Sequence, residues 1–232
     1  MILSIHQPSY FPWLGLLSKI ANSDAVIVLD EVQLSDNAFQ HRNLFLTATG
    51  SEKFLSIPFT RKNYLARPFG DLEIASTDWS GKHWAFLRNS YRKHPFAAEL
   101  WPVLEPYYTT PYERLIDPVL ASMVLCLSLL NLSTRVVLQS TLDYDRSLHK
   151  GDLVLALCQA AGASCYLSGT GAQAYLDDKA FQRHLPLRYT TFTHPVYPQL
   201  GRSIFVPGLS SLDLLFNVGI ERAGQLLRHG IE

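Results

Sequence analysis

Residues 2–31 read ILSIHQPSYFPWLGLLSKIANSDAVIVLDE and predict the fold class of the chain. The apolar run Ile2–Ile5 ends at polar residues and a proline, which is typical of a buried strand that leads into a loop. Apolar residues at helical spacing follow over residues 14–21, and a second apolar run occupies residues 25–29. A strand, a helix and a second strand in this order predict a βαβ unit, with two parallel strands side by side.

Strand and helix patterns also alternate toward the C-terminus, which favours an α/β architecture with a mostly parallel sheet. The sequence therefore predicts one α/β domain over residues 1–232, with a Rossmann-like sheet flanked by helices and a mixed insertion over residues 36–112. The further expected elements are strands over residues 53–59, 72–74, 135–138, 164–167 and 187–192, and helices over residues 77–91, 112–130, 152–161 and 210–228.

Charge and composition exclude two classes of protein. Twenty Lys and Arg residues balance twenty Asp and Glu residues, so the chain lacks the positive excess that drives non-specific nucleic-acid binding. Hydrophobic residues make up 47% of the chain and charged residues only 17%, which is not the composition of an intrinsically disordered protein. We expect a folded protein that binds a small molecule rather than a nucleic acid.

The sequence also predicts a cytoplasmic location. The N-terminus lacks a basic segment followed by an apolar core, so it does not resemble a signal peptide. The longest apolar run, near residues 119–132, is about 14 residues and is shorter than the roughly 20 that a membrane span needs. The cysteines, Cys126, Cys158 and Cys165, are odd in number and show no CxxC spacing, so we expect reduced thiols.

The first polar cluster follows the first predicted strand. His6 can act as an acid, a base or a hydrogen-bond donor to phosphate, and Gln7 adds an amide. Tyr10 and Trp13 offer flat apolar faces, and Gly15 permits close approach of a ligand. The alternative is a rigid loop whose aromatic side chains fill the core, and local evidence does not separate the two.

The second cluster follows the second predicted strand. Asp30 and Gln33 can hold a sugar, a ribose or an amine, and Asn43 offers a further amide. Arg42 suits a phosphate or carboxylate, because its guanidinium forms paired hydrogen bonds. Local evidence slightly favours the alternative of a solvated surface loop. His6, Asp30 and His41 lack the spacing of metal ligands, so no metal site is expected.

The third and fourth clusters follow later predicted strands. Gly169 and Gly171, next to Ser168, can present backbone N–H groups to an anion, although no GxGxxG, Walker or GxSxG motif is present and a plain turn is an equal alternative. The fourth cluster is His194, Tyr197 and Gln199, and it repeats the chemistry of the first cluster. Because parallel strands end at one edge of a sheet, the four clusters together predict a single polar cleft.

These clusters resemble the WbqC-like family over nearly the whole chain. The segments that carry the resemblance are His6-Gln7-Pro8-x-Tyr10-x-Pro12-Trp13-x-Gly15, Leu29-Asp30-x-Val32-Gln33, Arg42-Asn43, Tyr166-Leu167-Ser168-Gly169 with Tyr175-Leu176-Asp177, and His194-Pro195-x-Tyr197-x-Gln199. The resemblance implies a setting in bacterial O-antigen and surface-polysaccharide gene clusters. It also implies transfer of glycine to an amino sugar, a role suggested for members of that family.

A fainter similarity links the N-terminal segment to the nucleotidyltransferase-like α/β group that includes pantothenate synthetase. The stretch Trp13–Leu16 stands where those enzymes have His-x-Gly-His, and both histidines are missing here. The similarity implies amide formation through an activated carboxylate, with ATP as an open cofactor.

Together the two resemblances favour an enzyme that joins an acyl group, with glycyl as a candidate, to a nucleotide-linked amino sugar. His6, His194 and Asp30 are then the candidate catalytic groups, and the other residues of the clusters bind substrate. Arg42 and the Gly169–Gly171 turn would hold phosphate, and Tyr10 and Trp13 would stack on a base or sugar. The alternative is a non-catalytic module that binds the same class of ligand.

Overall fold

The computed structural model of the chain describes residues 1–35, 39–174, 176 and 181–229. Its centre is a five-stranded sheet in the order β5-β2-β1-β6-β7, and every neighbouring pair in it is parallel. The first βαβ unit is confirmed, because β1 and β2 pair from Leu3 with Ala25 to His6 with Val28. The strands of this sheet are β1 (Ile2–His6), β2 (Ala25–Val28), β5 (Arg135–Leu138), β6 (Cys165–Gly169) and β7 (Leu187–Thr190).

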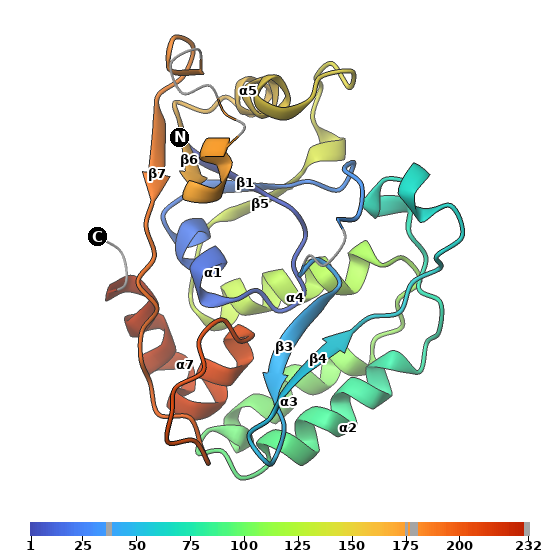
Figure 1. The fold of residues 1–232 in the computed structure, drawn as a ribbon, viewed down its shortest axis with the longest axis vertical. Coiled ribbons are helices and arrows are strands. Elements are labelled where there is room, and N and C mark those ends of the chain that lie inside the picture. Colours follow the sequence, from blue (N-terminus) through green and yellow to red (C-terminus); the bar gives the residue numbers. More distant parts are fainter. Residues whose placement is uncertain (36–38, 175, 177–180, 230–232) are drawn as a thin grey trace.

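Helices cover both faces of this sheet, as Figure 1 shows. Alternate residues of a strand point to opposite faces, so Leu3 and Ile5 of β1 pack against α5. Val26 and Val28 of β2 belong to the larger core on the other face, with α1, α4 and α7. The helices are α1 (Leu14–Ala21), α2 (Trp79–Tyr91), α3 (Ala97–Thr109), α4 (Ile116–Leu129), α5 (Lys150–Ala160) and α7 (Ser211–His229).

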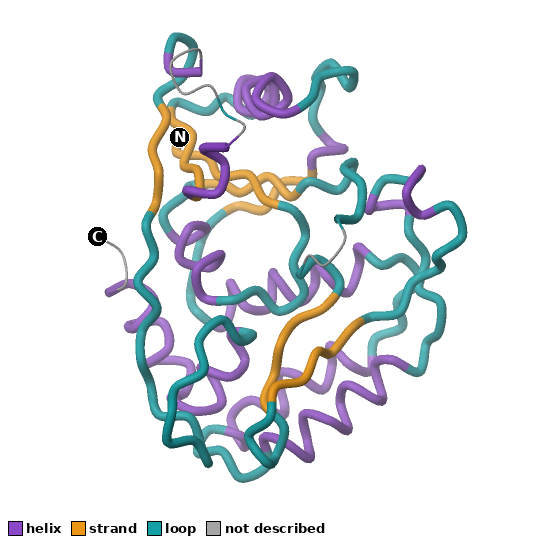
Figure 2. Tube along the Cα trace, viewed as in Figure 1, coloured by secondary structure: helices purple, strands orange, loops and turns teal. Residues whose placement is uncertain are grey.

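The predicted mixed insertion lies between β2 and α4. It contains an antiparallel hairpin, β3 (Arg42–Leu46) with β4 (Glu52–Ser56), which Figure 2 shows well apart from the main sheet. Helices α2 and α3 follow this hairpin. The predicted α/β fold with a parallel sheet is thus confirmed.

Two predicted elements inside and beside the insertion differ from the structure, and strand β3 and helix α3 were not predicted. Within residues 72–74, Glu73 and Ile74 form isolated bridges rather than a strand. The helix expected over residues 112–130 begins only at Ile116. Helix α3 was not predicted, because Pro102 and Pro106 lie inside it and proline normally interrupts a helix.

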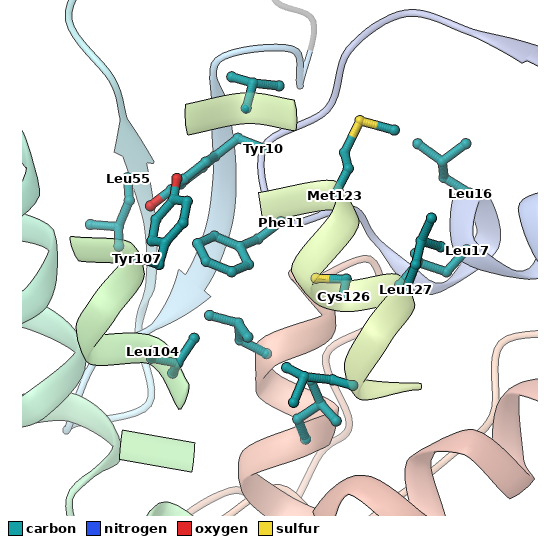
Figure 3. Close-up of a cluster of buried hydrophobic side chains, with 14 of the residues drawn as sticks. Tyr10, Phe11, Leu16, Leu17, Leu55, Leu104, Tyr107, Met123, Cys126 and Leu127 are labelled. Atoms are coloured by element: carbon teal, nitrogen blue, oxygen red, sulfur yellow. The ribbon is translucent and has the colours of Figure 1, made fainter. Parts of the chain in front are cut away.

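The loop after β1 inserts two aromatic side chains into the larger core (Figure 3). Tyr10 and Phe11 are fully buried. The Tyr10 hydroxyl lies 2.9 Å from Nδ1 of His83 and 2.9 Å from the Tyr108 hydroxyl, so its polar atom is satisfied inside the core. Asn43 donates to the carbonyls of both Tyr10 and Phe11 and thereby fixes the turn. The loop is therefore anchored by the insertion.

We expect the protein to lose stability in acid through His83. Burial lowers the pKa of His83 to about 4, whereas the histidine of an unfolded chain titrates near 6.5. Below pH 6.5 the unfolded chain binds the proton and the folded chain does not, so stability falls as the pH drops. The loss between pH 7 and pH 4.5 is on the order of 2 kcal/mol for this one group.

Urea unfolding at several pH values measures this effect. His83→Gln removes the titrating group, so the variant should be less stable than the wild type at pH 7 but show a flatter decline toward pH 4.5. An equally steep decline in wild type and variant would show that His83 does not contribute.

Candidate functional site

A crevice opens at the carboxyl edge of the sheet, between β1 and β6. Strands β2 and β5 lie on one side of β1, and β6 and β7 lie on the other, so the direction of strand addition switches there. The pairing of β1 with β2 continues to His6, whereas its pairing with β6 ends at Ser4 and Leu167. The two strands therefore part near their carboxyl ends, at the position where open α/β sheets bind ligands.

Two adjoining hollows of about 470 Å³ and 440 Å³ occupy this crevice. Both are lined by His6 of β1, Lys19 of α1, and Gly169 and Gly171 after β6. Another hollow, of about 510 Å³, lies near the opposite edge of the sheet and contains none of the motif residues. The first hollow is further lined by Trp13, Gly15, Leu16, Thr170, Thr190, Thr191 and Phe192, and the second by Ile5, Gln7, Leu29, Val154, Tyr166, Ser168 and Ala172.

His6 is half-buried at the end of β1. Its Nδ1 lies 2.8 Å from the carbonyl oxygen of Gln7, which can only accept, so Nδ1 carries the proton. Burial lowers the pKa of His6 to about 3, and the positive charge of Lys19 lowers it further, against an opposing contribution from the hydrogen bond to Gln7. The neutral ring leaves Nε2 as a hydrogen-bond acceptor.

Lys19 is the functional candidate that sequence reasoning missed. Its side chain is buried, and Nζ donates to the carbonyl of Ile5 over 2.9 Å. Burial lowers the pKa of Lys19 to about 8. The available signal was a lysine inside the otherwise apolar helix LGLLSKIA, adjacent to Ile20 and three residues after Leu16.

Trp13 forms an aromatic wall of the first hollow. Its indole remains 37% exposed and meets the Phe192 ring edge-on at a centroid distance of 5.6 Å. The backbone of Trp13 pairs with Ser210 in an isolated bridge, which fixes the start of α1. Gly15 leaves room for the indole, because a Cβ at this position would lie 2.1 Å from a Trp13 ring atom.

The structure therefore brings only part of the predicted site together. The predicted site residues that line the two hollows are His6, Gln7, Trp13, Ser168, Gly169 and Gly171. Tyr10 and Asn43 instead belong to the core packing already described. Of the motif residues after β6, Tyr175 and Asp177 lie outside the described part of the chain.

The second polar cluster is used mainly for internal contacts. Asp30 accepts from the backbone N–H and the hydroxyl of Ser140 at 2.9 Å and 2.5 Å, which ties the end of β2 to the end of β5. The amide of Gln33 donates to the carbonyl of Leu65. The Arg42 guanidinium lies over the Phe54 ring, 4.7 Å from its centroid. None of these three predicted residues lines either hollow.

The fourth cluster holds the loop after β7 in place, and the expectation that it repeats the chemistry of the first stays a prediction. His194 donates from Nδ1 to the Pro195 carbonyl and accepts at Nε2 from the Gly208 N–H at 3.2 Å, so both ring nitrogens are engaged. The Tyr197 hydroxyl and the Gln199 amide both donate to the buried carboxylate of Asp213. These partners come from later in the chain and could not be foreseen from the motif.

Within the described ranges, no group of three or more His, Cys, Asp or Glu side chains is arranged to hold a metal ion. None of the helices in the same part of the chain is both long and apolar enough to span a lipid bilayer.

The sheet and its carboxyl-edge crevice define an α/β protein with the geometry of a small-molecule site. The chain belongs to the WbqC-like protein family, whose model matches residues 7–224. It is 31% identical over 223 residues to the uncharacterized protein Rv1507c of Mycobacterium tuberculosis, a match that covers 94% of each chain. No solved structure matches significantly. The fainter similarity to the nucleotidyltransferase-like group stays a prediction.

Replacing Gly15 by alanine should displace the Trp13 indole without unfolding the protein. The added Cβ collides with the far end of the ring, which can swing toward solvent, and alanine itself favours the helix by about 1 kcal/mol. We expect a red shift in tryptophan emission that disappears when Trp13→Phe is also present.

Gly81→Ala is the matched control, because an added Cβ there meets no atom within 4 Å. Its emission should equal that of the wild type. If Gly15→Ala also leaves the emission unchanged, Gly15 does not determine the position of the Trp13 indole.

Proposed function

We propose that this protein is an enzyme of surface-polysaccharide biosynthesis that transfers an acyl group to the amine of a nucleotide-linked amino sugar. Membership of the WbqC-like family suggests the polysaccharide setting. Glycyl is the first candidate for the acyl group. The observation that carries the proposal is the placement of His6, Lys19 and Trp13 around one crevice at the switch point of the sheet.

The proposed reaction forms a C–N bond between the sugar amine and the carbonyl carbon of an activated carboxylate, such as an acyl phosphate or acyl adenylate. It breaks the bond from that carbon to the phosphate oxygen, and the phosphate group leaves with the electron pair. The amine must present its lone pair to this carbon, and its proton passes to solvent as the bond forms. Nε2 of His6 can accept a hydrogen bond from the amine and so aim the lone pair. Because the pKa of His6 is about 3, the ring can orient the amine but does not hold a proton taken from it at neutral pH.

Aromatic and small residues supply the binding surfaces of the proposed site. The exposed face of Trp13, supported by Phe192, is suited to stack on a nucleobase or a sugar ring. Gly169 and Gly171 leave open space beside the crevice, since an added Cβ at either position meets no atom within 4 Å. Thr170, Thr190 and Thr191 add hydroxyl groups along the rim.

A second candidate function is binding of the same ligand class without turnover. The low pKa of His6 favours it, because a ring that resists protonation is a weak general base. The two functions share the crevice and differ only in whether a product forms. ATP is a candidate cosubstrate of the transfer reaction, so the reaction is assayed both with ATP and without it.

His6→Gln should lower turnover at least tenfold while the protein stays folded. Gln keeps a polar side chain but does not place a ring nitrogen at the same position, and a tenfold loss corresponds to about 1.4 kcal/mol. The expected loss in stability is under about 1.5 kcal/mol. Mass spectrometry of a nucleotide-linked amino sugar incubated with glycine, with and without ATP, reports the added glycyl group.

His194→Gln is the control histidine, because both nitrogens of His194 already bind within the protein. This variant should lose stability and keep the wild-type rate in the fraction that remains folded. Turnover lost in His194→Gln and retained in His6→Gln would contradict the site. Ligand binding by the wild type with no product from any acyl donor would favour the binding module.

A further inference from the structure

We propose that Lys19 is an anion-binding residue that holds a phosphate or carboxylate group of the ligand beside His6. The inference deepens the proposed function and rests on it for the use of the crevice. None of the predicted clusters contains this residue, and the anionic group it would hold belongs to the ligand rather than to the protein.

The first support is a buried cation without a carboxylate partner in the described chain. Lys19 is only 7% exposed, and the recorded salt bridges of the described residues do not include it. Its recorded hydrogen bond uses one of the three donors of the ammonium group, to the Ile5 carbonyl. A buried charge is costly unless it is paired, so an anionic ligand would supply the missing interaction.

The second support is the place of the ammonium group in the sheet. The ladder between β1 and β6 ends at Ser4 and Leu167, and Nζ of Lys19 binds the carbonyl of the next residue, Ile5. The ammonium group therefore lies where the two strands part. Both hollows are lined by Lys19, so a ligand in either one can reach it.

The third support is the charge of the surroundings. The titratable side chains among the described lining residues of the two hollows are His6, Lys19 and Tyr166, and none is a carboxylate. His6 faces Lys19 from β1, and the neutral ring does not compete for the anion. Gly169 and Gly171 leave space for an anion opposite β1. Among the described residues that line the crevice, no acid would repel a negative group.

A pH dependence follows from the burial of Lys19. Burial lowers the pKa of this lysine to about 8, and an anion binds its protonated form. Above pH 8 the empty protein must first regain the proton, so affinity should fall by up to about tenfold per pH unit. Because the pKa of His6 is about 3, the ring stays neutral above pH 6.5 and does not contribute to this change in affinity.

Calorimetric titration of the full chain with sulfate and with pyrophosphate tests the proposal. Sulfate keeps its charge between pH 6.5 and 9.5, so its profile reports the protein alone. We expect wild-type binding that weakens above pH 8 and becomes at least tenfold weaker in Lys19→Met. Glycine and a nucleoside diphosphate, titrated separately, distinguish carboxylate from phosphate as the source of the anion.

Lys62→Gln is the matched control, because it removes an exposed lysine that does not line the crevice. It should bind sulfate as the wild type does. Lys19→Met retains the apolar stem and removes the buried charge, so the empty variant should be at least as stable as the wild type. A less stable variant with unchanged affinity for sulfate would show that Lys19 only satisfies the backbone carbonyl of Ile5, and the proposal would be wrong.

The remaining outcomes separate this inference from the proposed function. Lys19-dependent anion binding without any amide product would support the anion site and contradict the transferase. Amide formation that is unaffected in Lys19→Met would support the transferase and overturn the anion site. No wild-type binding of sulfate, pyrophosphate or the nucleoside diphosphate would also overturn it.

Discussion

The parting of β1 from β6 after Ser4 and Leu167 is the constraint on which the site depends. Up to that point hydrogen bonds hold the central strands together, and beyond it the strand ends diverge. The divergence coincides with the switch in the order of strand addition, so β2 and β6 carry their following loops to opposite sides of β1. A crevice follows from the topology, and the sequence decides which side chains line it.

The loop after β1 contains both core residues and crevice residues, and its aromatic sequence motif does not distinguish between them. Tyr10 and Phe11 enter the core and bind Asn43 of the insertion through their carbonyls. His6 and Trp13, at either end of this buried segment, line the crevice. Because the middle of the loop is anchored, its ends are held in fixed positions. This anchoring explains how core residues and site residues can share one motif.

The features that could be predicted from the sequence are those that depend on local patterns of residues. The βαβ unit and the parallel sheet follow from apolar periodicity, whereas the strand order that places the crevice at β1 is seen only in the structure. The contacts of the fourth cluster could not be predicted, because Gly208 and Asp213, which bind His194 and Tyr197, come from later in the chain. Lys19 was missed for a related reason, since a lysine in a short helix is usually solvated and only the packing shows it buried.

His6 and Lys19, which both line the crevice, interact through their charges. Burial is the larger cause of the low pKa of His6, and the positive charge of Lys19 adds to it. An anion held at Lys19 offsets that charge and removes the second cause while burial remains. The ligand that occupies the anion site would thus raise the basicity of His6 at the moment an amine lies beside it. Under this coupling, the charge of Lys19 adds to the burial that keeps the His6 ring neutral until an anion binds.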